Sequence, residues 1–479
     1  MRVLHVGFGY RPWIVNGLVI YCENLMEGQA QAGHEVGYFF AGRRLPVVRR
    51  SFLHRWERRN VKMFEWVNST LVVGRHRGTA EPERDLGEAP AETAMLRVLR
   101  RFAPELVHIH DLGGLPSSII GIAQRHGVPV VMTLHDYQSL CPTVKLYDAE
   151  DRVCLRREPG EMCVVCCAEA PLDNREDLER TVWYTRMRLR TAIPRLDAAL
   201  SRPAAARLVP RRRGPAGHPP APVRPRSTAA AYQRRRNLNV ERLGQLDALI
   251  TISERSAEIC RHLGVSDERM RMLRINPSHI ELLQPKRDRR PGRPLRFAVL
   301  NAANSTQKGA DLIVEALGHL SRRGLDDRYR LSVRGWIAPH VQTALAAHPS
   351  VEIEGDYRTD QLNALLEDVD VGLVPSVWEE VYGFVGLEFL AKGIPVIGNA
   401  LGGIPEYVRP GETGWLNRSA SAVELADLMT AAIEEPDEVQ RLGAGAMELR
   451  GDLIRPFATQ LTELSALYGE LTAQARRLS

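Results

Sequence analysis

Short apolar runs alternate with stretches of helical periodicity along most of the chain. The runs that predict buried strands are residues 3–7, 36–41, 106–110, 130–135, 248–252, 270–275, 296–300, 331–335, 369–374 and 395–398. Between them, apolar residues recur every three to four positions in 18–32, 92–102 and 310–320, which predicts helices. This alternation predicts the α/β class, with parallel sheets covered by helices on both faces.

Length and composition narrow the class further. A chain of 479 residues predicts two domains, each large enough to bury a core. Apolar residues make up 44% and charged residues 25%, as in ordinary globular proteins. No run of eighteen apolar residues predicts a membrane span, and the first residues form a strand rather than the apolar core of a signal peptide. We therefore expect a cytoplasmic protein.

The net charge of +6 comes from one tract. Residues 201–236 contain ten Arg and seven Pro but no Lys, Asp or Glu, so the remainder of the chain carries −4. Such a segment buries too little apolar surface to offset its ordering entropy, which predicts a disordered insertion. Three interpretations stay open: weak contact with anionic lipid at the inner membrane face or with nucleic acid, a solvated loop without a role, or an artefact of the sequence. None gives the tract a part in catalysis.

The most informative stretch is 370–416. A strand ends at Pro375, a polar loop with Glu379 and Glu380 follows, and a helical pattern starts after Gly383. The first N–H groups of a helix and its dipole attract phosphate, and glycine leaves room for the anion. A carboxylate accepts hydrogen bonds from the hydroxyls of a sugar or ribose. The residues alone are equally compatible with a surface loop whose glutamates cap a helix.

A family resemblance favours the functional interpretation. Glu380 and Glu388 are separated by seven residues, an arrangement similar to the E-x7-E motif of retaining GT-B glycosyltransferases of family 4. The sequences 375–376, 391–396, 402–406 and 411–414 fit the same pattern in register. The resemblance implies a GT-B fold, two Rossmann-like doubly wound domains that face each other across a cleft. The expected parts are residues 1–284, a linker at 285–294, a nucleotide-sugar-binding domain at 295–454, and a helix at 455–479 that crosses back.

The resemblance also implies roles for individual residues. In the family the first Glu lies against the transferred sugar, the second binds the ribose, and amides between them hold phosphate. Carried over, the catalytic residues are Glu380, His135 and Asp136, with His135 reaching the sugar. The donor-binding residues are Lys308, Gly383, Phe384, Val385, Glu388, Gly17 and Arg334. The family places an arginine where this chain has Ala303, so neutralisation of the diphosphate is expected to rest more heavily on Lys308, or on a substitute such as Arg334.

Alternatives stay open at several of these positions. If Lys308 does not bind the donor, it is a solvated lysine, although the positive end of a helix disfavours a lysine at that place. The segment 7–21 resembles the opening strand and helix of the family, although Asn16 stands where the family usually has a glycine. The alternative is a simple strand–helix turn without a role in binding. Of the histidines in 106–111, His108 is interpreted as a core residue with satisfied hydrogen bonds, and His110 could line the cleft.

Five of the seven cysteines lie in a polar loop, residues 141–167. Cys163 and Cys166 form a CxxC, and Cys141 and Cys154 complete a set of four thiolates that suits a structural zinc site. The spacing outside the CxxC is loose, so free thiols remain the alternative. No cofactor is expected for catalysis, because GT-B enzymes as a class use no catalytic metal.

The resulting hypothesis is a retaining glycosyltransferase that moves a sugar from a nucleotide-diphosphate sugar to a hydroxyl acceptor. The acceptor is a glycan, a lipid-linked molecule or a secondary metabolite. A GT-B sugar-nucleotide epimerase or a phosphorylase is the enzymatic alternative. A zinc- and Arg-tract nucleic-acid binder is the non-enzymatic one. The charge of −4 outside the tract and the lack of interleaved aromatic residues disfavour it, so no specific nucleic acid is expected.

Overall fold

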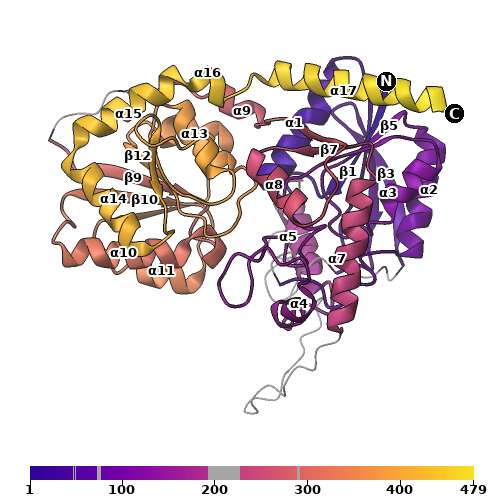
Figure 1. Cartoon of the computed structure of the whole chain (residues 1–479), viewed down its shortest axis with the longest axis horizontal. Helices are drawn as coiled ribbons and strands as arrows, with labels where there is room; N and C mark the ends of the chain where they lie inside the picture. The colour runs from indigo at the N-terminus through magenta and orange to yellow at the C-terminus, as the bar shows by residue number, and fades with distance from the viewer. Residues whose placement is uncertain (47, 49, 73–76, 193–226, 288–291, 479) are drawn as a thin grey trace, which may run out of the picture. The chain divides into compact units, whose positions relative to one another are not determined.

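The chain forms two compact α/β units (Figure 1). The computed structural model describes residues 1–46, 48, 50–72, 77–192, 227–287 and 292–478. Unit 1 comprises Met1–Thr251, Ala257–Arg271 and Leu461–Ser479, and unit 2 comprises Ile252–Ser256 and Met272–Gln460. Unit 2 therefore begins before the linker predicted at 285–294, because α9 (Ser278–Glu281) already packs against α13 (Phe384–Ala391).

Unit 1 is built on an eight-stranded sheet. Its strands are β1 (Arg2–Phe8), β2 (Glu35–Ala41), β3 (Phe52–Arg58), β4 (Val61–Val67), β5 (Leu106–Ile109), β6 (Val130–Thr133), β7 (Ala248–Thr251) and β8 (Met270–Met272). Their order is β3-β4-β2-β1-β5-β6-β7-β8. The pairs from β4 to β7 are parallel, and β3 is an antiparallel strand at the edge. The order reverses direction at β1 and β5, and ligands of such sheets gather beyond the strand ends at that reversal.

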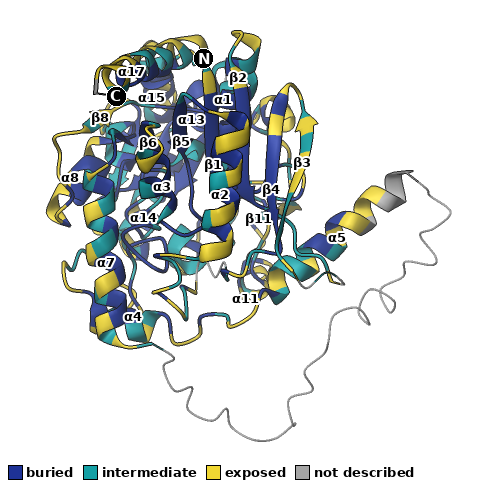
Figure 2. Cartoon of the chain, turned by 90° about the vertical axis from the view of Figure 1, so that its right-hand side faces the viewer, coloured by how far each residue is buried: buried dark blue, intermediate teal, exposed yellow. Residues whose placement is uncertain are grey.

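The helices of unit 1 give the sheet its buried faces. They are α1 (Gly17–Gln31), α2 (Ala89–Phe102), α3 (Ile119–Arg125), α4 (Gly160–Cys166), α5 (Arg175–Ala192), α7 (Ala229–Gly244), α8 (Glu254–His262) and α17 (Phe457–Leu478). In Figure 2, β1 is coloured as buried over nearly its whole length, and α2 shows buried and exposed stripes. Helix α1 starts where Asn16 accepts a hydrogen bond from the Val19 N–H at 2.8 Å. Asn16 thus works as a helix cap at the position where the family usually has a glycine.

The end of the Arg/Pro/Ala tract differs from the prediction of disorder. Residues 193–226 lie outside the described part of the chain, and so does most of the tract. Its last residues, however, belong to α7, where Arg235 and Arg236 are buried. Arg235 donates to Asp85 at 2.8 Å and Arg236 donates to the Arg156 carbonyl at 3.0 Å. The prediction of disorder from composition was wrong for these residues, because the acceptors for their guanidinium groups come from distant parts of unit 1.

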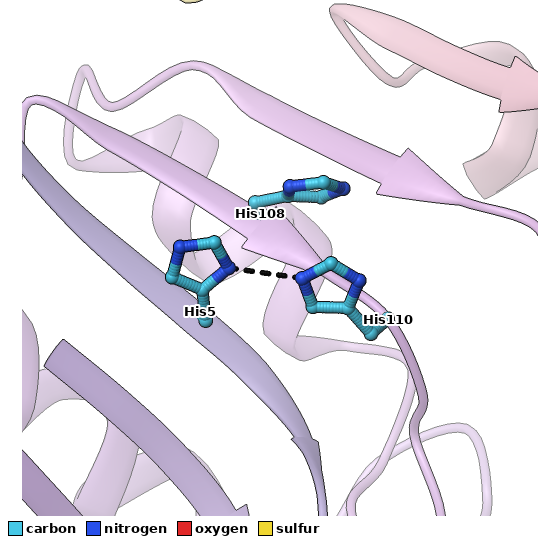
Figure 3. A group of neighbouring side chains, drawn as sticks. All are labelled: His5, His108 and His110. Carbon is cyan, nitrogen blue, oxygen red and sulfur yellow. Dashed lines mark hydrogen bonds between the residues drawn. The ribbon is translucent and has the colours of Figure 1, made fainter. Parts of the chain in front are cut away.

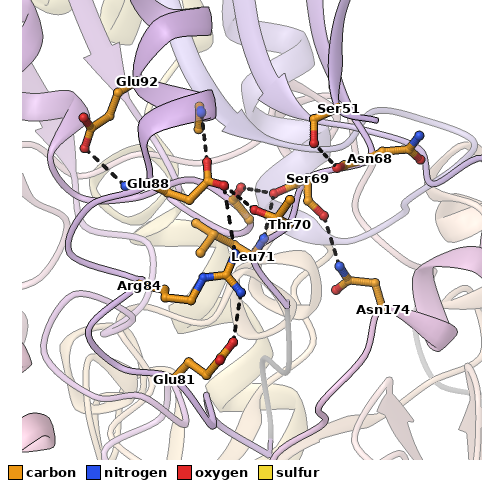
Figure 4. A network of polar contacts seen from close by, with 12 residues as sticks. Ser51, Asn68, Ser69, Thr70, Leu71, Glu81, Arg84, Glu88, Glu92 and Asn174 are labelled. Atoms are coloured by element: carbon orange, nitrogen blue, oxygen red, sulfur yellow. Dashed lines mark hydrogen bonds and ion pairs between the residues drawn. The ribbon is translucent and has the colours of Figure 1, made fainter. Parts of the chain in front are cut away.

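A polar network fixes the loop between β4 and α2 (Figure 4). Asn174 donates to the Ser69 carbonyl at 3.0 Å, and the Ser69 hydroxyl donates to the Gly114 carbonyl at 2.7 Å. Glu88 caps α2 by accepting from the Ala91 N–H at 2.9 Å. The loop that follows β4 is thereby tied to two other segments of unit 1, at Gly114 and Asn174.

Unit 2 is a six-stranded parallel sheet. Its strands are β9 (Leu295–Leu300), β10 (Tyr329–Arg334), β11 (Val351–Gly355), β12 (Val371–Val374), β13 (Val396–Asn399) and β14 (Gly414–Asn417). The order β11-β10-β9-β12-β13-β14 is that of a dinucleotide-binding Rossmann domain, 3-2-1-4-5-6 in local numbering. The glycines of 411–414 predicted a turn, which the structure has at 411–413, and β14 follows directly and pairs with β13. The direction reverses between β9 and β12, so ligands are expected at the loops after these two strands.

The remaining elements of unit 2 surround this sheet. They are α9, α10 (Ala310–Arg322), α11 (Pro339–Leu345), α12 (Leu362–Leu365), α13, α14 (Ala422–Glu434), α15 (Pro436–Glu448) and α16 (Arg450–Leu453), with single turns at Thr306–Lys308, Thr359–Gln361 and Ile404–Glu406. The core of this unit joins β9, β10 and β12 to α10 and α14. Helix α13 packs on β12 and is almost entirely buried.

Candidate active site

Two loops of unit 2 meet at the reversal of its sheet. Lys308 lies after β9 and Glu380 lies after β12, and the Lys308 Nζ donates to Glu380 Oε2 at 2.7 Å. Ser376 donates to the same oxygen at 3.0 Å, and the Trp378 ring lies 5.4 Å from the Lys308 ammonium. The structure thus brings together two of the residues that the sequence predicted for the site. Both side chains keep partial access to solvent, so a ligand can compete for either of them.

The main chain of Glu380 is held from behind by a glycine turn. The Gly403 N–H donates to the Glu380 carbonyl at 2.7 Å. Gly402 has a φ of +58°, and a Cβ there would overlap the backbone of Glu380. The neighbouring Glu379 turns inward, accepts from Arg255 at 2.6 and 3.1 Å, and receives the Gly402 N–H at 2.9 Å. Glu379 therefore fixes the loop, while Glu380 presents its carboxylate.

Helix α13 begins immediately after this loop. Its cap, Gly383, has a φ of +77°, and a Cβ would lie 3.0 Å from Glu380 Cγ and 3.1 Å from the Tyr407 hydroxyl. The first N–H groups of a helix have no acceptor within the helix. The amides of Phe384 and Val385 occupy this first turn, at the end of the helix that carries positive partial charge.

Glu388, one helical turn further on, is buried and only half satisfied. Its Oε1 accepts from His279 Nε2 at 2.8 Å, and no hydrogen-bond partner for its Oε2 is found among the described residues. Tyr357 lies nearby and accepts a hydrogen bond from Asn301 at 2.9 Å. Burial, with a smaller contribution from Glu388, raises the pKa of Tyr357, so it stays a neutral phenol. An unpartnered buried carboxylate oxygen costs free energy unless a ligand hydroxyl reaches it.

Two predicted donor-binding residues have other surroundings. Arg334, at the end of β10, forms an ion pair with Glu354 on β11. Gly17 is exposed in the first turn of α1, in unit 1. The donor-binding roles of Arg334 and Gly17 therefore stay predictions.

In unit 1, His135 and Asp136 follow β6, near the reversal of the sheet. The half-buried His135 directs Nε2 toward His110 Nδ1 at 3.2 Å, and burial lowers the pKa of His135 to about 3. His135 is therefore neutral at physiological pH. Asp136 accepts from the Gln138 N–H at 2.9 Å, which shapes the loop. His108 is fully buried between Tyr468 and Thr133, which confirms its interpretation as a satisfied core histidine.

The four cysteines of the predicted zinc site lie in one region of unit 1. Cys163 and Cys166 lie on α4, and all seven cysteines of the chain are free thiols. Among the described residues, no three of Cys141, Cys154, Cys163 and Cys166 have sulfur atoms within 4.8 Å of one another. Burial raises the pKa of Cys166 to about 12, which favours the thiol. A structural zinc stays a prediction, which elemental analysis of the purified protein would test.

Comparison with protein-family models decides the family. Residues 15–274 match the model described as "Glycosyltransferase Family 4", and residues 296–435 match "Glycosyl transferases group 1". The first match alone covers more than half of the chain. The protein belongs to glycosyltransferase family 4.

Individual family members are similar over part of their length. D-inositol 3-phosphate glycosyltransferase of Corynebacterium aurimucosum is 29% identical over 193 residues, 38% of this chain and 45% of the relative. MMP alpha-(1->4)-mannosyltransferase of Mycolicibacterium hassiacum is 27% identical over 206 residues, 42% of this chain and 48% of the relative. The chain thus spans about half the length of each of these relatives.

Solved structures place the family 4 chain in a known fold. Sucrose-phosphate synthase from Thermosynechococcus elongatus superposes with a TM-score of 0.63 at 16% identity, and the match covers 99% of each chain. HepE of Anabaena, solved in complex with UDP-glucose, gives a TM-score of 0.56 at 12% identity and covers 97% and 99%. The fold is GT-B. Among the described residues, no helix combines the length and apolar character needed to span a membrane.

Several residues of the site were beyond prediction from the sequence. Arg255 binds Glu379, His279 binds Glu388, and Tyr357 lies near Glu388, but each of the three comes from a segment distant in sequence. None belongs to a recognisable motif. Only the clustering of strand ends at one edge of the sheet could have indicated where to look.

Proposed function

We propose that this chain is a retaining glycosyltransferase that moves a sugar from a nucleotide-diphosphate sugar to a hydroxyl acceptor. The observation that carries the proposal is the constellation of Lys308, Glu380 and half-satisfied Glu388 around the start of α13. It lies at the sheet reversal of unit 2, where Rossmann domains bind nucleotides. Family membership and the UDP-glucose complex of HepE support the same donor class.

Each part of the constellation fits one part of such a donor. The unpartnered Oε2 of Glu388 would accept hydrogen bonds from the ribose hydroxyls. The diphosphate would lie at the N-terminus of α13, against the Phe384 and Val385 amides and the Lys308 ammonium. These groups would stabilise the negative charge that grows on the leaving diphosphate, the main electrostatic task of the reaction.

Donor binding would change the partner of Lys308. In the structure its ammonium neutralises Glu380. A diphosphate carries more charge than one carboxylate, so it would draw Lys308 away and leave Glu380 to accept from a hydroxyl of the sugar. The resemblance gives His135 and Asp136 further contacts with the sugar and the acceptor. Same-face attack by the acceptor hydroxyl would then retain the anomeric configuration. Neither an epimerase nor a nucleic-acid binder finds support in the comparisons.

Release of nucleoside diphosphate from a panel of nucleotide sugars tests the proposal. Wild type is compared with Lys308→Ala and Glu388→Ala, and with Arg441→Ala as a control on the exposed side of α15. We expect slow hydrolysis of one donor, lost in the first two variants and kept in the control. The absence of both turnover and calorimetric binding of every donor by the folded wild type would overturn the proposal. Analysis of the product anomer with an identified acceptor tests retention.

A further inference from the structure

A continuous chain of hydrogen bonds leads from helix α1 to His135 in unit 1. Gln29 Oε1 lies 2.7 Å from His5 Nε2, His5 Nδ1 lies 2.9 Å from His110 Nε2, and His110 Nδ1 lies 3.2 Å from His135 Nε2. Figure 3 shows the bonded rings of His5 and His110, with His108 beside them. Gln29, His5 and His110 are at most 2% exposed, and only His135 at the end is half-buried.

Burial keeps the imidazoles of this chain neutral. It lowers the pKa of His5 to about 4 and that of His110 well below its usual value. A neutral imidazole has one N–H donor and one bare acceptor nitrogen. Each ring can therefore donate on one side only, and the direction chosen by one ring dictates that of the next.

The amide of Gln29 sets this direction. Its oxygen can only accept, so His5 donates from Nε2 and leaves Nδ1 bare. The bare Nδ1 of His5 requires an N–H at His110 Nε2, and the bare Nδ1 of His110 requires an N–H at His135 Nε2. At the half-buried end of the chain, Nδ1 of His135 is then the atom without a proton.

A second branch of hydrogen bonds lies beside the first in unit 1. Tyr468 lies 2.5 Å from His108 Nδ1, and His108 Nε2 lies 2.7 Å from Thr133 Oγ1. Burial raises the pKa of Tyr468, so its side chain stays a neutral phenol. The buried Nε2 of Gln29 has no hydrogen-bond partner among the described residues, so no hydrogen bond from Gln29 joins the second branch to the main chain of bonds.

The geometry points to a positioning role for Gln29, His5 and His110. We propose that they hold His135 as the Nε2–H tautomer, so that Nδ1 accepts a hydrogen bond from a hydroxyl of the transferred sugar. The tautomer follows from the structure of unit 1 alone, whereas the hydroxyl ligand rests on the proposed function. His135 is then an acceptor for a hydroxyl and cannot donate to a ring oxygen or a phosphate.

The ¹⁵N signals of labelled histidine rings in the full-length protein test the tautomer, because protonated and bare ring nitrogens resonate far apart. In wild type we expect a protonated Nε2 and a bare Nδ1 at His135. The opposite pattern would mean that the Gln29 amide is turned, and it would overturn the proposal. His135→Gln identifies the signals of that residue.

Two near-isosteric variants test the positioning role. Gln29→Met removes the amide that orients the chain of bonds, and Tyr468→Phe removes one hydroxyl from the second branch. We expect mixed tautomers at His135 in Gln29→Met, and unchanged signals at His135 with shifted signals at His108 in Tyr468→Phe. An unchanged His135 spectrum in folded Gln29→Met would refute the role of Gln29. If that variant does not fold, the wild-type spectrum still decides the tautomer.

Donor analogues test the hydroxyl ligand. Fluorine replaces a hydroxyl at nearly equal size but cannot donate a hydrogen bond, so fluorination at the contacted position should lower kcat/KM about tenfold, the value of one hydrogen bond. The difference in kcat/KM between the natural and the fluorinated donor should be smaller in Gln29→Met than in wild type. Equal kcat/KM for every fluorinated donor would overturn the ligand assignment. If wild type processes no nucleotide sugar at all, the proposed function fails, while the ring-nitrogen signals still decide the tautomer.

Discussion

Both units gather polar side chains near the reversal of their sheets but keep them in opposite electrostatic states. In unit 2, Lys308 and Glu380 are charged partners with access to water. In unit 1, His5, His108 and His110 are buried and uncharged. A charged pair near solvent can exchange its partner for a ligand at modest cost. Neutral rings in a core cannot take up charge, but their hydrogen bonds are directional. The first cluster suits charge stabilisation and the second suits orientation.

The largest effect is expected from removing the exchangeable charge. Lys308→Met keeps much of the side-chain length but loses the ammonium, and kcat for donor turnover should fall by about 10² to 10³, as when one charge-stabilising group is lost. Lys308→Arg should retain part of the activity because it keeps the charge. Steady-state kinetics with the identified donor measures both. If Lys308→Met turned over the donor about as fast as wild type, the charged pair of unit 2 would have no role in charge stabilisation, and this difference from unit 1 would be refuted.

A change to the support of Glu380 should affect stability more than chemistry. Arg255→Met leaves the buried Glu379 carboxylate without its cation, which should lower the free energy of unfolding by about 2–3 kcal/mol. Urea unfolding measures the change. In a Glu379→Gln background the same substitution should cost much less, because no charge is left unpaired. Equal costs in both backgrounds would show that the ion pair does not hold the loop.

The neutral cluster predicts a dependence of stability on pH. The pKa of His5 is about 4 in the folded protein and near 6.5 in the unfolded chain, so the contribution of His5 is complete above pH 6.5. It is lost as pH falls from 6.5 toward 4, by about 1.4 kcal/mol per pH unit. Wild type should therefore lose stability more steeply over this range than His5→Phe. The exposed His340 is the control, since curves for His340→Phe and wild type should run in parallel.

The smallest effect is expected where charge is neither buried nor near a ligand. Lys62 pairs with Glu35 on the surface of unit 1, and about half of each side chain is exposed. Lys62→Met should change the free energy of unfolding by about 0.5 kcal/mol or less. If Lys62→Met lowered the free energy of unfolding as much as Arg255→Met in the same urea assay, the contribution of an ion pair to stability would not depend on its exposure to solvent.

Much of the fold could be predicted because a buried parallel strand has a continuous run of apolar residues in its sequence. The runs at 3–7, 106–110 and 369–374 coincide with β1, β5 and β12. The edge strand β3 was missed because charged residues interrupt its sequence, as is common at sheet edges. The turn predicted at 411–414 leads directly into β14, a strand that the prediction did not include, and a Cβ at Gly414 would overlap the Val396 backbone. That glycine serves the close approach of β14 to β13.

The candidate site divides in a similar way. Glu380 and Glu388 could be named from the sequence because the family motif fixes their spacing, and Lys308 because the wider resemblance to the family implies its role. Their partners could not, because Arg255 lies 124 residues from Glu379 and His279 lies 109 residues from Glu388. The orienting role of Gln29 was equally hidden, since nothing in an amphipathic helix distinguishes an amide that faces a histidine. Such contacts arise only when the chain folds.

Helix α17 limits how this protein can be divided for laboratory work. Its residues from Leu461 onward belong to unit 1, although the rest of that unit ends at Arg271. A fragment that stops at residue 271 would lack Tyr468 and leave the buried His108 Nδ1 without its partner. Such a fragment is better expressed together with the peptide 461–479, or with that peptide joined to it in a circularly permuted gene. Recovery of the folded fragment only when the peptide is present would make this helix the basis of a split-protein reporter.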